Sequence, residues 1–372
     1  MRFTHRFEGV LRQCEARCQL HKPHRLGETS AVAKEPQGVQ RIRSIRNTLN
    51  SMGLQRSQVQ QQFHEAFIQC CAQHLFCDDQ VDMGQIMSAY NWKHIKQSCL
   101  TLTPRRFGKT TSVAMYVGAY ALCVPNSETC VFSTGKRAST KMLELIASLV
   151  VAAPGGAERI VKQNAEQLWV SGSGPADVRK ISSYPSAVST LRGVGGNLLI
   201  LEEAAFIDTQ LFLEVVVPLL QMQTCSLIAI STPQSGSNYY SELFTLKGPD
   251  NKPFFTTIRV GMACKVCEAK GLADSCTHQA AVRPPWQSEE KADLMQALYG
   301  SRTDLLNREV KGLITDNKDA VYEQAGVDRA MQRELVVDRN AVHSALIACD
   351  PNGGGTSEMC LITLTFYQGN LT

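Results

Sequence analysis

The chain has 372 residues and a mass of 41.0 kDa, which is enough for two domains or for one large α/β domain with additions. Hydrophobic residues make up 44% and charged residues 19%, so a core can form and disorder of the whole chain is excluded. No apolar run is long enough for a membrane span, and the pattern of a secretory signal is missing. We therefore expect a soluble, intracellular protein whose 14 cysteines are mostly reduced.

The net charge of +4 is unevenly distributed. Residues 1–60 carry 11 Lys and Arg against 4 Glu, a net +7, which leaves −3 for the remainder. This asymmetry indicates either an acidic partner such as nucleic acid or a solvated basic tail. The Arg-bearing start is also compatible with a transit peptide, against which Glu8 and Glu15 count. We expect residues 1–60 to be a basic, loosely ordered extension with short helices.

Short apolar strands alternate with helices in the rest of the chain. Helical spacing over 59–89 is followed by an α/β alternation. The expected strands are 99–102, 129–133, 198–201 and 226–231, the expected helices are 108–123, 138–151 and 208–220, and residues 158–190 form a β excursion. This pattern predicts a mostly parallel sheet with helices on both faces, whose ligands gather at the carboxyl ends of the strands.

The first polar motif is Thr-Pro-Arg-Arg-Phe-Gly-Lys-Thr at 103–110, between a strand and a helix. Gly108 allows the backbone to approach a phosphate, Lys109 can reach the β- and γ-phosphates, and the Thr110 hydroxyl can ligate Mg²⁺. Thr103 replaces the usual first glycine of a P-loop. The alternative is that Gly-Lys-Thr occurs here by chance. Its position between a predicted strand and a predicted helix argues against that alternative.

The second and third motifs follow two further strands. Glu202 and Glu203 end a buried strand, where one acid can hold Mg²⁺ and the other can orient or deprotonate the water that attacks the γ-phosphate. The alternative is a solvated Glu-Glu pair. Ser231, Thr232 and Pro233 follow the next strand, where a polar group can sense the γ-phosphate. Taken alone, they form only a junction between a strand and a turn.

The order of these motifs, with Leu-Arg-Gly at 191–193 before the acidic strand, resembles the large terminase subunit. This family contains the DNA-packaging motors of tailed phages and herpesviruses, and the resemblance covers roughly residues 95–372. It implies a P-loop ATPase with ATP and Mg²⁺ as cofactors, and Arg105 or Arg106 as an arginine finger. The implied nucleotide-binding residues are Thr103, Pro104, Arg105, Arg106, Phe107, Gly108, Lys109, Thr110, Thr111, Glu202, Ser231 and Thr232.

One position departs from the family. Terminases normally carry Asp and then Glu after the acidic strand, whereas this chain has Glu202 and Glu203. The Glu202 side chain is one methylene longer, which makes hydrolysis a weaker expectation than nucleotide binding. We expect Glu202→Asp to leave activity unchanged or to raise it.

Cys264, Cys267, Cys276 and His278 form a C-x2-C-x8-C-x-H pattern. Three thiolates and one imidazole supply the four tetrahedral ligands of a structural Zn²⁺ site. The sequence thus predicts a small zinc insertion at 262–285, with unliganded thiols as the alternative.

The apolar residues 346–349 lead into Asp350, followed by a glycine turn and a second strand at 359–366. By the same resemblance, this is the start of a ribonuclease H-like nuclease domain, with Asp350 as its first metal ligand. The alternative for Asp350 is a turn residue at a strand end. Two-metal cleavage needs carboxylates from several strands. We therefore expect an incomplete nuclease domain at 338–372.

These expectations divide the chain into the extension 1–60, a P-loop ATPase domain at 61–337 and the nuclease start at 338–372. The resemblance implies a motor that moves double-stranded DNA into a capsid as a homo-oligomeric ring, with a portal protein and a small terminase subunit. It would act at the capsid portal, in the nucleus or the cytoplasm according to the virus. The alternatives are an eroded or regulatory homologue that binds ATP or DNA without efficient turnover, and another nucleic-acid-dependent P-loop ATPase.

Overall fold

A computed structural model describes residues 35–174, 176–185, 195–234, 238–261, 266–267, 270, 284–314, 326, 329, 342–350, 360–367 and 370–371. The chain divides into two compact units between residues 317 and 318.

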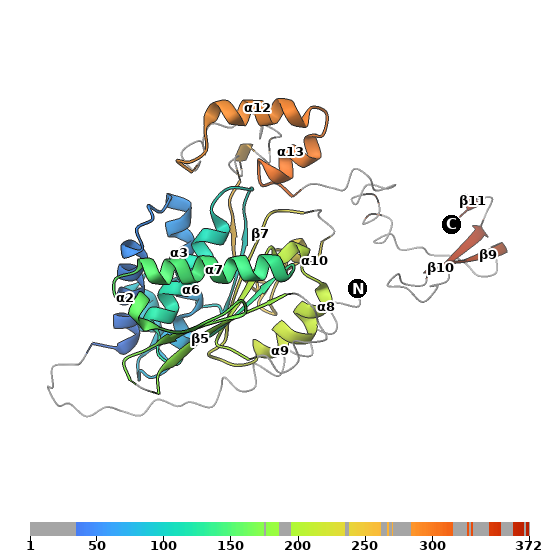
Figure 1. Ribbon diagram of the computed structural model, residues 1–372. Coiled ribbons are helices and arrows are strands. Elements are labelled where there is room, and N and C mark those ends of the chain that lie inside the picture. Colours follow the sequence, from blue (N-terminus) through green and yellow to red (C-terminus); the bar gives the residue numbers. More distant parts are fainter. Residues whose placement is uncertain are drawn as a thin grey trace. The chain divides into compact units, whose positions relative to one another are not determined.

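The first unit is built on an eight-stranded sheet with the order β3-β4-β5-β2-β6-β7-β1-β8 (Figure 1). All neighbours from β5 to β8 are parallel, and β3, β4 and β5 form an antiparallel meander at one edge. This confirms the predicted mostly parallel α/β sheet. The strands are β1 (Ser98–Leu102), β2 (Glu128–Ser133), β3 (Ile160–Gln163), β4 (Gln167–Ser171), β5 (Val178–Pro185), β6 (Leu198–Glu202), β7 (Ser226–Ser231) and β8 (Thr256–Arg259).

Helices cover both faces of this sheet. Alternate residues of a strand point to opposite faces, and in β6 Leu198 and Ile200 belong to one buried cluster while Leu199 and Leu201 belong to another. The first cluster joins α2, α3, α6 and α7 to the sheet, and the second joins α8, α9 and α10 (Figure 1). The α-helices in the described part of the first unit are α2 (Gln37–Ser51), α3 (Gln58–Cys70), α4 (Ala72–Leu75), α5 (Met83–Ala89), α6 (Lys109–Cys123), α7 (Lys136–Ala152), α8 (Thr209–Leu211), α9 (Val217–Leu219), α10 (Tyr239–Leu243), α12 (Glu289–Tyr299) and α13 (Thr303–Glu309).

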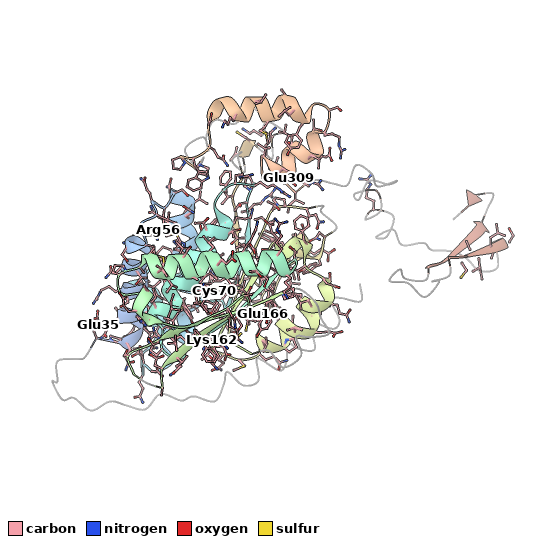
Figure 2. All side chains as sticks on the ribbon, in the orientation of Figure 1. Glu35, Arg56, Cys70, Lys162, Glu166 and Glu309 are labelled. Atoms are coloured by element: carbon pink, nitrogen blue, oxygen red, sulfur yellow. The ribbon has the colours of Figure 1, made fainter. Side chains whose placement is uncertain are left out.

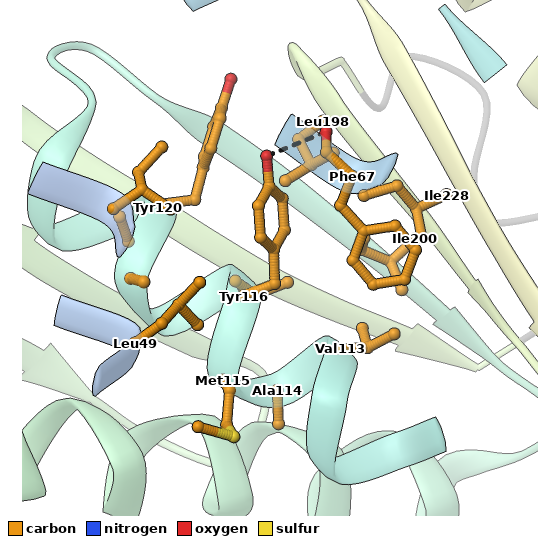
Figure 3. Packing of buried hydrophobic residues seen from close by; sticks show 14 of the residues in the cluster. Leu49, Phe67, Val113, Ala114, Met115, Tyr116, Tyr120, Leu198, Ile200 and Ile228 are labelled. Atoms are coloured by element: carbon orange, nitrogen blue, oxygen red, sulfur yellow. Dashed lines mark hydrogen bonds between the residues drawn. The ribbon is translucent and has the colours of Figure 1, made fainter. Parts of the chain in front are cut away.

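Helix α6, which begins at the P-loop, lies at the centre of the first cluster. The Tyr116 hydroxyl donates a hydrogen bond to the Phe67 carbonyl oxygen over 3.1 Å, and the two rings meet edge to face at 5.4 Å (Figure 3). Because the polar end of the buried tyrosine is satisfied, its ring can fill the core between α3 and α6 without a desolvation penalty at the hydroxyl. The start of α6 is therefore held on a packed base.

The expectation of a loosely ordered extension over residues 1–60 is wrong for its later part. Helix α2 spans 15 residues, and its Ile42, Ile45 and Leu49 are completely buried. Their spacing of three, four and seven residues places them on one side of a helix. Basic residues between them give the segment its polar composition, but the apolar stripe is what docks α2 on the core.

The predicted helix 208–220 is interrupted. Residues Phe212–Val216 adopt a π-helical turn between α8 and α9, and Pro218 lies in α9. Proline has no amide hydrogen to donate and its ring crowds the preceding turn, so a regular α-helix cannot continue through it. The wider turn just before Pro218 accommodates this break.

The second unit contains an antiparallel sheet of β9 (Val342–Asp350), β10 (Cys360–Tyr367) and β11 (Asn370–Leu371). The predicted pair of strands around the glycine turn is therefore present, and Asp350 is the last residue of β9. The ribonuclease H-like interpretation of this unit stays a prediction. Within the described residues of both units, no helix has the length and apolar character needed to cross a membrane.

His64 joins α3 to α6 inside the core. Its Nδ1 accepts a hydrogen bond from Arg56 Nη1 over 3.0 Å, and its Nε2 therefore donates to the Ser112 carbonyl oxygen over 2.9 Å. Burial lowers the pKa of His64 from 6.5 to about 4, and burial also lowers the pKa of His74 to about 4. In an unfolded chain both side chains would take up a proton near pH 6.5. In the folded chain they stay neutral until the pH approaches 4.

This predicts a loss of stability in acid. Between pH 6.5 and 4 the unfolded state binds more protons than the folded state, so the free energy of unfolding falls as the pH drops. Each histidine contributes up to about 3 kcal/mol to this fall. His64→Gln keeps a donor for Ser112 and an acceptor for Arg56 but does not titrate, so urea unfolding at pH 7.5 and pH 5 should show a smaller difference than in the parent. Replacing His94, which is exposed and whose pKa is also lowered by partial burial, with Gln is the comparison and should change the pH dependence less than His64→Gln does. An unchanged pH dependence in His64→Gln contradicts the assignment.

Candidate functional site

The three motifs lie side by side at the carboxyl ends of β1, β6 and β7. The strand order β6-β7-β1 places β7 between the strand that leads into the P-loop and the strand that ends in the acids. Parallel neighbours stand about 4.8 Å apart, so the ends of β6 and β1 are separated by about 10 Å. Side chains can meet across this distance, and the end of β7 lies in the middle.

Gly108 ends the P-loop with φ at +75°, the left-handed conformation that glycine adopts at low cost. A Cβ atom at this position would lie 2.6 Å from Gln60 Nε2, which donates to the Gly108 carbonyl oxygen over 3.3 Å. Helix α6 begins at the next residue with no side-chain cap and no acidic residue in its first turn. The free amide groups of this first turn are suited to an anion.

Lys109 is a buried cation at the start of α6. Its exposed fraction is 6%, its Nζ donates to the Pro104 carbonyl oxygen over 3.4 Å, and Glu203 Oε1 lies 3.8 Å away. Burial lowers the pKa of Lys109, and the negative charge of Glu203 opposes that shift. The ammonium group is short of compensating charge, which favours an anionic ligand beside it.

Glu202 is bound to two hydroxyl groups. Thr110 Oγ1 donates to Glu202 Oε1 over 2.9 Å, and Ser133 Oγ at the end of β2 donates to Oε2 over 3.0 Å. Burial raises the pKa of Glu202, and these two hydrogen bonds oppose the shift. The structure thus brings together the two residues from which the sequence predicts a Mg²⁺ site. It also adds Ser133, which sequence reasoning missed.

The side chain of Glu203 binds a different set of groups from that of Glu202. Its Oε2 accepts hydrogen bonds from the Thr232 amide and the Thr232 hydroxyl, both over 3.1 Å, and from Ser231 Oγ over 3.5 Å. Its Oε1 is the atom that faces Lys109. Ser231 and Thr232 are completely buried behind it. The third motif therefore contacts the second acid directly.

A cavity of about 600 Å³ opens between these groups, which is large enough for part of a nucleotide. Phe206, which is 45% exposed, forms part of its rim. The lining residues are Arg105, Arg106, Gly108, Lys109, Thr110, Thr111, Thr134, Glu203 and Phe206.

The loop that carries Arg105 and Arg106 is held from outside by the segment 284–314. Trp286 Nε1 donates to the Arg106 carbonyl oxygen over 2.8 Å, and the Arg105 guanidinium forms an ion pair with Glu309. Figure 2 labels Glu309, which is the last residue of α13. The Arg105 amide also donates to the Glu309 carbonyl oxygen over 2.9 Å. Both arginines line the cavity, but Arg105 is engaged with α13 in this conformation.

The contacts made by Gln60, Trp286 and Glu309 come from residues far away in the sequence and follow from no motif. One weak signal was available for Gln60, because Ser57 and Gln60 have the spacing of a helix capping box, and the structure contains that box. The box fixes the start of α3, from which the Gln60 amide reaches the P-loop.

Several predicted residues lie outside the described part of the chain. These are residues 191–193 and three of the four zinc candidates, Cys264, Cys276 and His278, whereas Cys267 is described and buried. Over the described residues there is no group of three or more His, Cys, Asp or Glu side chains able to hold a metal ion. The zinc insertion and the metal role of Asp350 stay predictions.

A second cavity, of about 580 Å³, lies at the other end of α6. Arg159 and Arg179 line it, and their guanidinium groups donate to the carbonyl oxygens of Leu122 and Ala121. Cations at these positions satisfy the last carbonyl groups of α6 and complement its dipole. This explains the two arginines as structural residues.

With the fold and the site described, the chain can be compared with known proteins. No family model matches the sequence, and no curated protein sequence matches it. The structure is similar to the large terminase of bacteriophage HK97, with a TM-score of 0.52 and 13% identity over 75% of this chain and 55% of that chain. Over the aligned part, this chain shares its fold with that large terminase.

Two other structures give lower scores. A point mutant of the ATPase domain of the Thermus phage P74-26 large terminase has a TM-score of 0.47 and 14% identity over 62% of this chain and 92% of that domain. A large terminase from a thermophilic bacteriophage, in complex with ADP, has a TM-score of 0.43 and 13% identity over 78% of this chain and 66% of that protein. At these identities the similarity concerns the fold, and the chain spans about half the length of the HK97 protein.

The geometry predicts that Lys109→Ala abolishes binding of a fluorescent ATP analogue with little effect on the melting temperature. The substitution removes a charge at the cavity that its surroundings compensate poorly, and it leaves the apolar core unchanged. Lys141→Ala, which removes an exposed lysine from α7, is the matched control. Parental binding by Lys109→Ala would show that the phosphate site has been misplaced.

Proposed function

We propose that the chain is an ATP-hydrolysing motor subunit of the large-terminase type, which moves double-stranded DNA into a viral capsid. The fold, the P-loop at the start of α6 and the two acids at the end of β6 support this proposal together. Nucleotide hydrolysis is its central element, and DNA movement depends on it.

The observation that carries the proposal is the contact between Thr110 and Glu202. Their oxygen atoms lie 2.9 Å apart, and the two residues come from the P-loop helix and the acidic strand. Neighbouring ligands of octahedral Mg²⁺ stand about 3.0 Å apart when the metal–oxygen distance is about 2.1 Å. A hydroxyl and a carboxylate at this separation fit the ion, and Thr110 and Glu202 would hold it. When bound, Mg²⁺ would neutralise charge on the phosphates.

The other residues have separate roles. The amide groups of the first turn of α6 and the Lys109 ammonium bind the phosphates of ATP. Glu203 orients the attacking water through Oε1 and accepts its proton. Arg105 and Arg106 are the two candidates for the arginine that stabilises charge in the transition state. For Arg105 this role requires release from Glu309.

The partners rest on the resemblance in motif order. They are double-stranded DNA, a portal protein and a small terminase subunit, with several copies of the chain in a ring around the DNA. ATP turnover measured with and without linear double-stranded DNA tests this part of the proposal. DNA should raise the turnover rate, and a rate that is independent of DNA would contradict the motor role.

Glu203→Gln should trap ATP without hydrolysis. The amide keeps the shape of the side chain but cannot take up a proton, so turnover should fall about 100- to 10,000-fold while ATP remains bound. Phosphate release and retention of labelled ATP would be measured together. Glu166→Gln changes an exposed acid in the turn between β3 and β4 and should behave like the parent (Figure 2). Turnover by Glu203→Gln at the parental rate would remove Glu203 from the mechanism.

The hydrogen bonds of Glu202 support an expectation for Glu202→Asp that is opposite to the one drawn from the sequence. The longer side chain bonds both Thr110 and Ser133, and aspartate is one methylene too short to keep both bonds from the same backbone position. We expect turnover to fall about tenfold or more, with a higher Mg²⁺ concentration needed for half-maximal rate. The measurement is a Mg²⁺ titration of turnover, with Ser133→Ala for comparison. Activity equal to or above that of the parent would support the shorter ligand instead.

A further inference from the structure

The Glu203 carboxylate is held asymmetrically. All three of its hydrogen bonds from the end of β7 go to Oε2, whereas the Lys109 ammonium, 3.8 Å away, faces Oε1. Oε1 is thus the oxygen on the side of the P-loop cavity. A carboxylate fixed through one oxygen has a defined direction for the lone pairs of the other.

Thr232 supplies the closer donors. Its amide and its hydroxyl each donate over 3.1 Å, while Ser231 Oγ is at 3.5 Å and also accepts a hydrogen bond from the Ala205 amide over 3.1 Å. Thr232 is 1% exposed, so water does not replace its hydroxyl at the carboxylate. Both of these donors belong to one residue, so the position of Thr232 fixes the direction of the Glu203 carboxylate.

The backbone of Glu203 adds a second reason for this anchor. Glu203 has φ and ψ of 50°, the left-handed conformation that non-glycine residues rarely adopt. This conformation turns the chain sharply after β6, and it separates the direction of Glu203 from that of Glu202. A side chain on a strained turn needs bonds of its own to keep one orientation.

We propose that Thr232 is a positioning residue for the hydrolytic step. Its amide and hydroxyl hold Oε2 of Glu203 so that Oε1 faces the water beside the γ-phosphate. This inference rests on the proposed function, and it assigns Thr232 a role through Glu203 rather than the contact with nucleotide expected from the sequence.

The test compares Thr232→Val, which replaces the hydroxyl with a methyl group of similar size, with Thr232→Ser, which keeps the hydroxyl. A misplaced base slows the chemical step without weakening substrate binding. Thr232→Val should lower kcat about ten- to a hundredfold and leave KM for ATP within about twofold, whereas Thr232→Ser should retain most of the activity. Thr232→Ala removes the hydroxyl without adding volume and serves if the valine variant folds poorly. Thr245→Val, on the exposed turn after α10, is the matched control.

The outcomes separate this inference from the function on which it rests. If the parent hydrolyses ATP, Glu203→Gln does not, and Thr232→Val keeps the parental kcat, the positioning role is wrong and the ATPase stands. A rise in KM at constant kcat makes Thr232 a nucleotide ligand and also overturns the inference. If the parent binds ATP but does not hydrolyse it under any condition, the proposed function fails, and the inference fails with it.

Discussion

Two buried ionisable side chains, Lys109 and Glu202, set the conditions that the rest of the site must meet. Burial alone drives each toward its neutral form, since it lowers the pKa of the lysine and raises that of the glutamate. Glu203 opposes the first shift, and the hydroxyls of Thr110 and Ser133 oppose the second. Two buried charges of this kind contribute little to folding stability, because the cost of desolvation offsets the attraction of their partners. Their presence is better explained by a ligand that brings both negative and positive charge to the site.

Strand β7 connects the parts that hold these charges. The Ser231 carbonyl oxygen accepts a hydrogen bond from the Thr103 amide over 3.1 Å, and the Ser231 hydroxyl accepts one from the Ala205 amide over 3.1 Å. One residue therefore fixes both the start of the P-loop and the turn after the acids, and the next residue bonds Glu203. A displacement at the end of β7 changes both halves of the site together. This is a physical route by which the third motif would act on the proposed hydrolysis.

The sequence predicted the features that depend on local pattern and missed those that depend on pairing across the fold. The bounds of β7 and the position of Gly108 follow from an apolar run and a loop motif, and both are found. The location of β7 between β6 and β1 could not be predicted, because strand order depends on contacts between distant segments. For the same reason the bond from Ser133 to Glu202 and the ion pair of Arg105 with Glu309 carried no signal. Helix α2 is an exception among the missed features, because the spacing of Ile42, Ile45 and Leu49 is a local pattern that predicts a helix. The polar composition of the segment hides this pattern.

Backbone strain is concentrated at the cavity. Five non-glycine residues in the described ranges have positive φ; three are asparagines, which tolerate this conformation, and the other two are Arg106 and Glu203. Both line the cavity, and both are held by bonds from other segments, Arg106 through Trp286 and Glu203 through Thr232. Glycine at either position would relieve the strain but would remove the charged side chain. A strained conformation persists only where surrounding structure over-determines it. In the described ranges, a cation and an acid are the residues other than asparagine and glycine that adopt positive φ. This is expected if their side chains, and not their backbones, are required there.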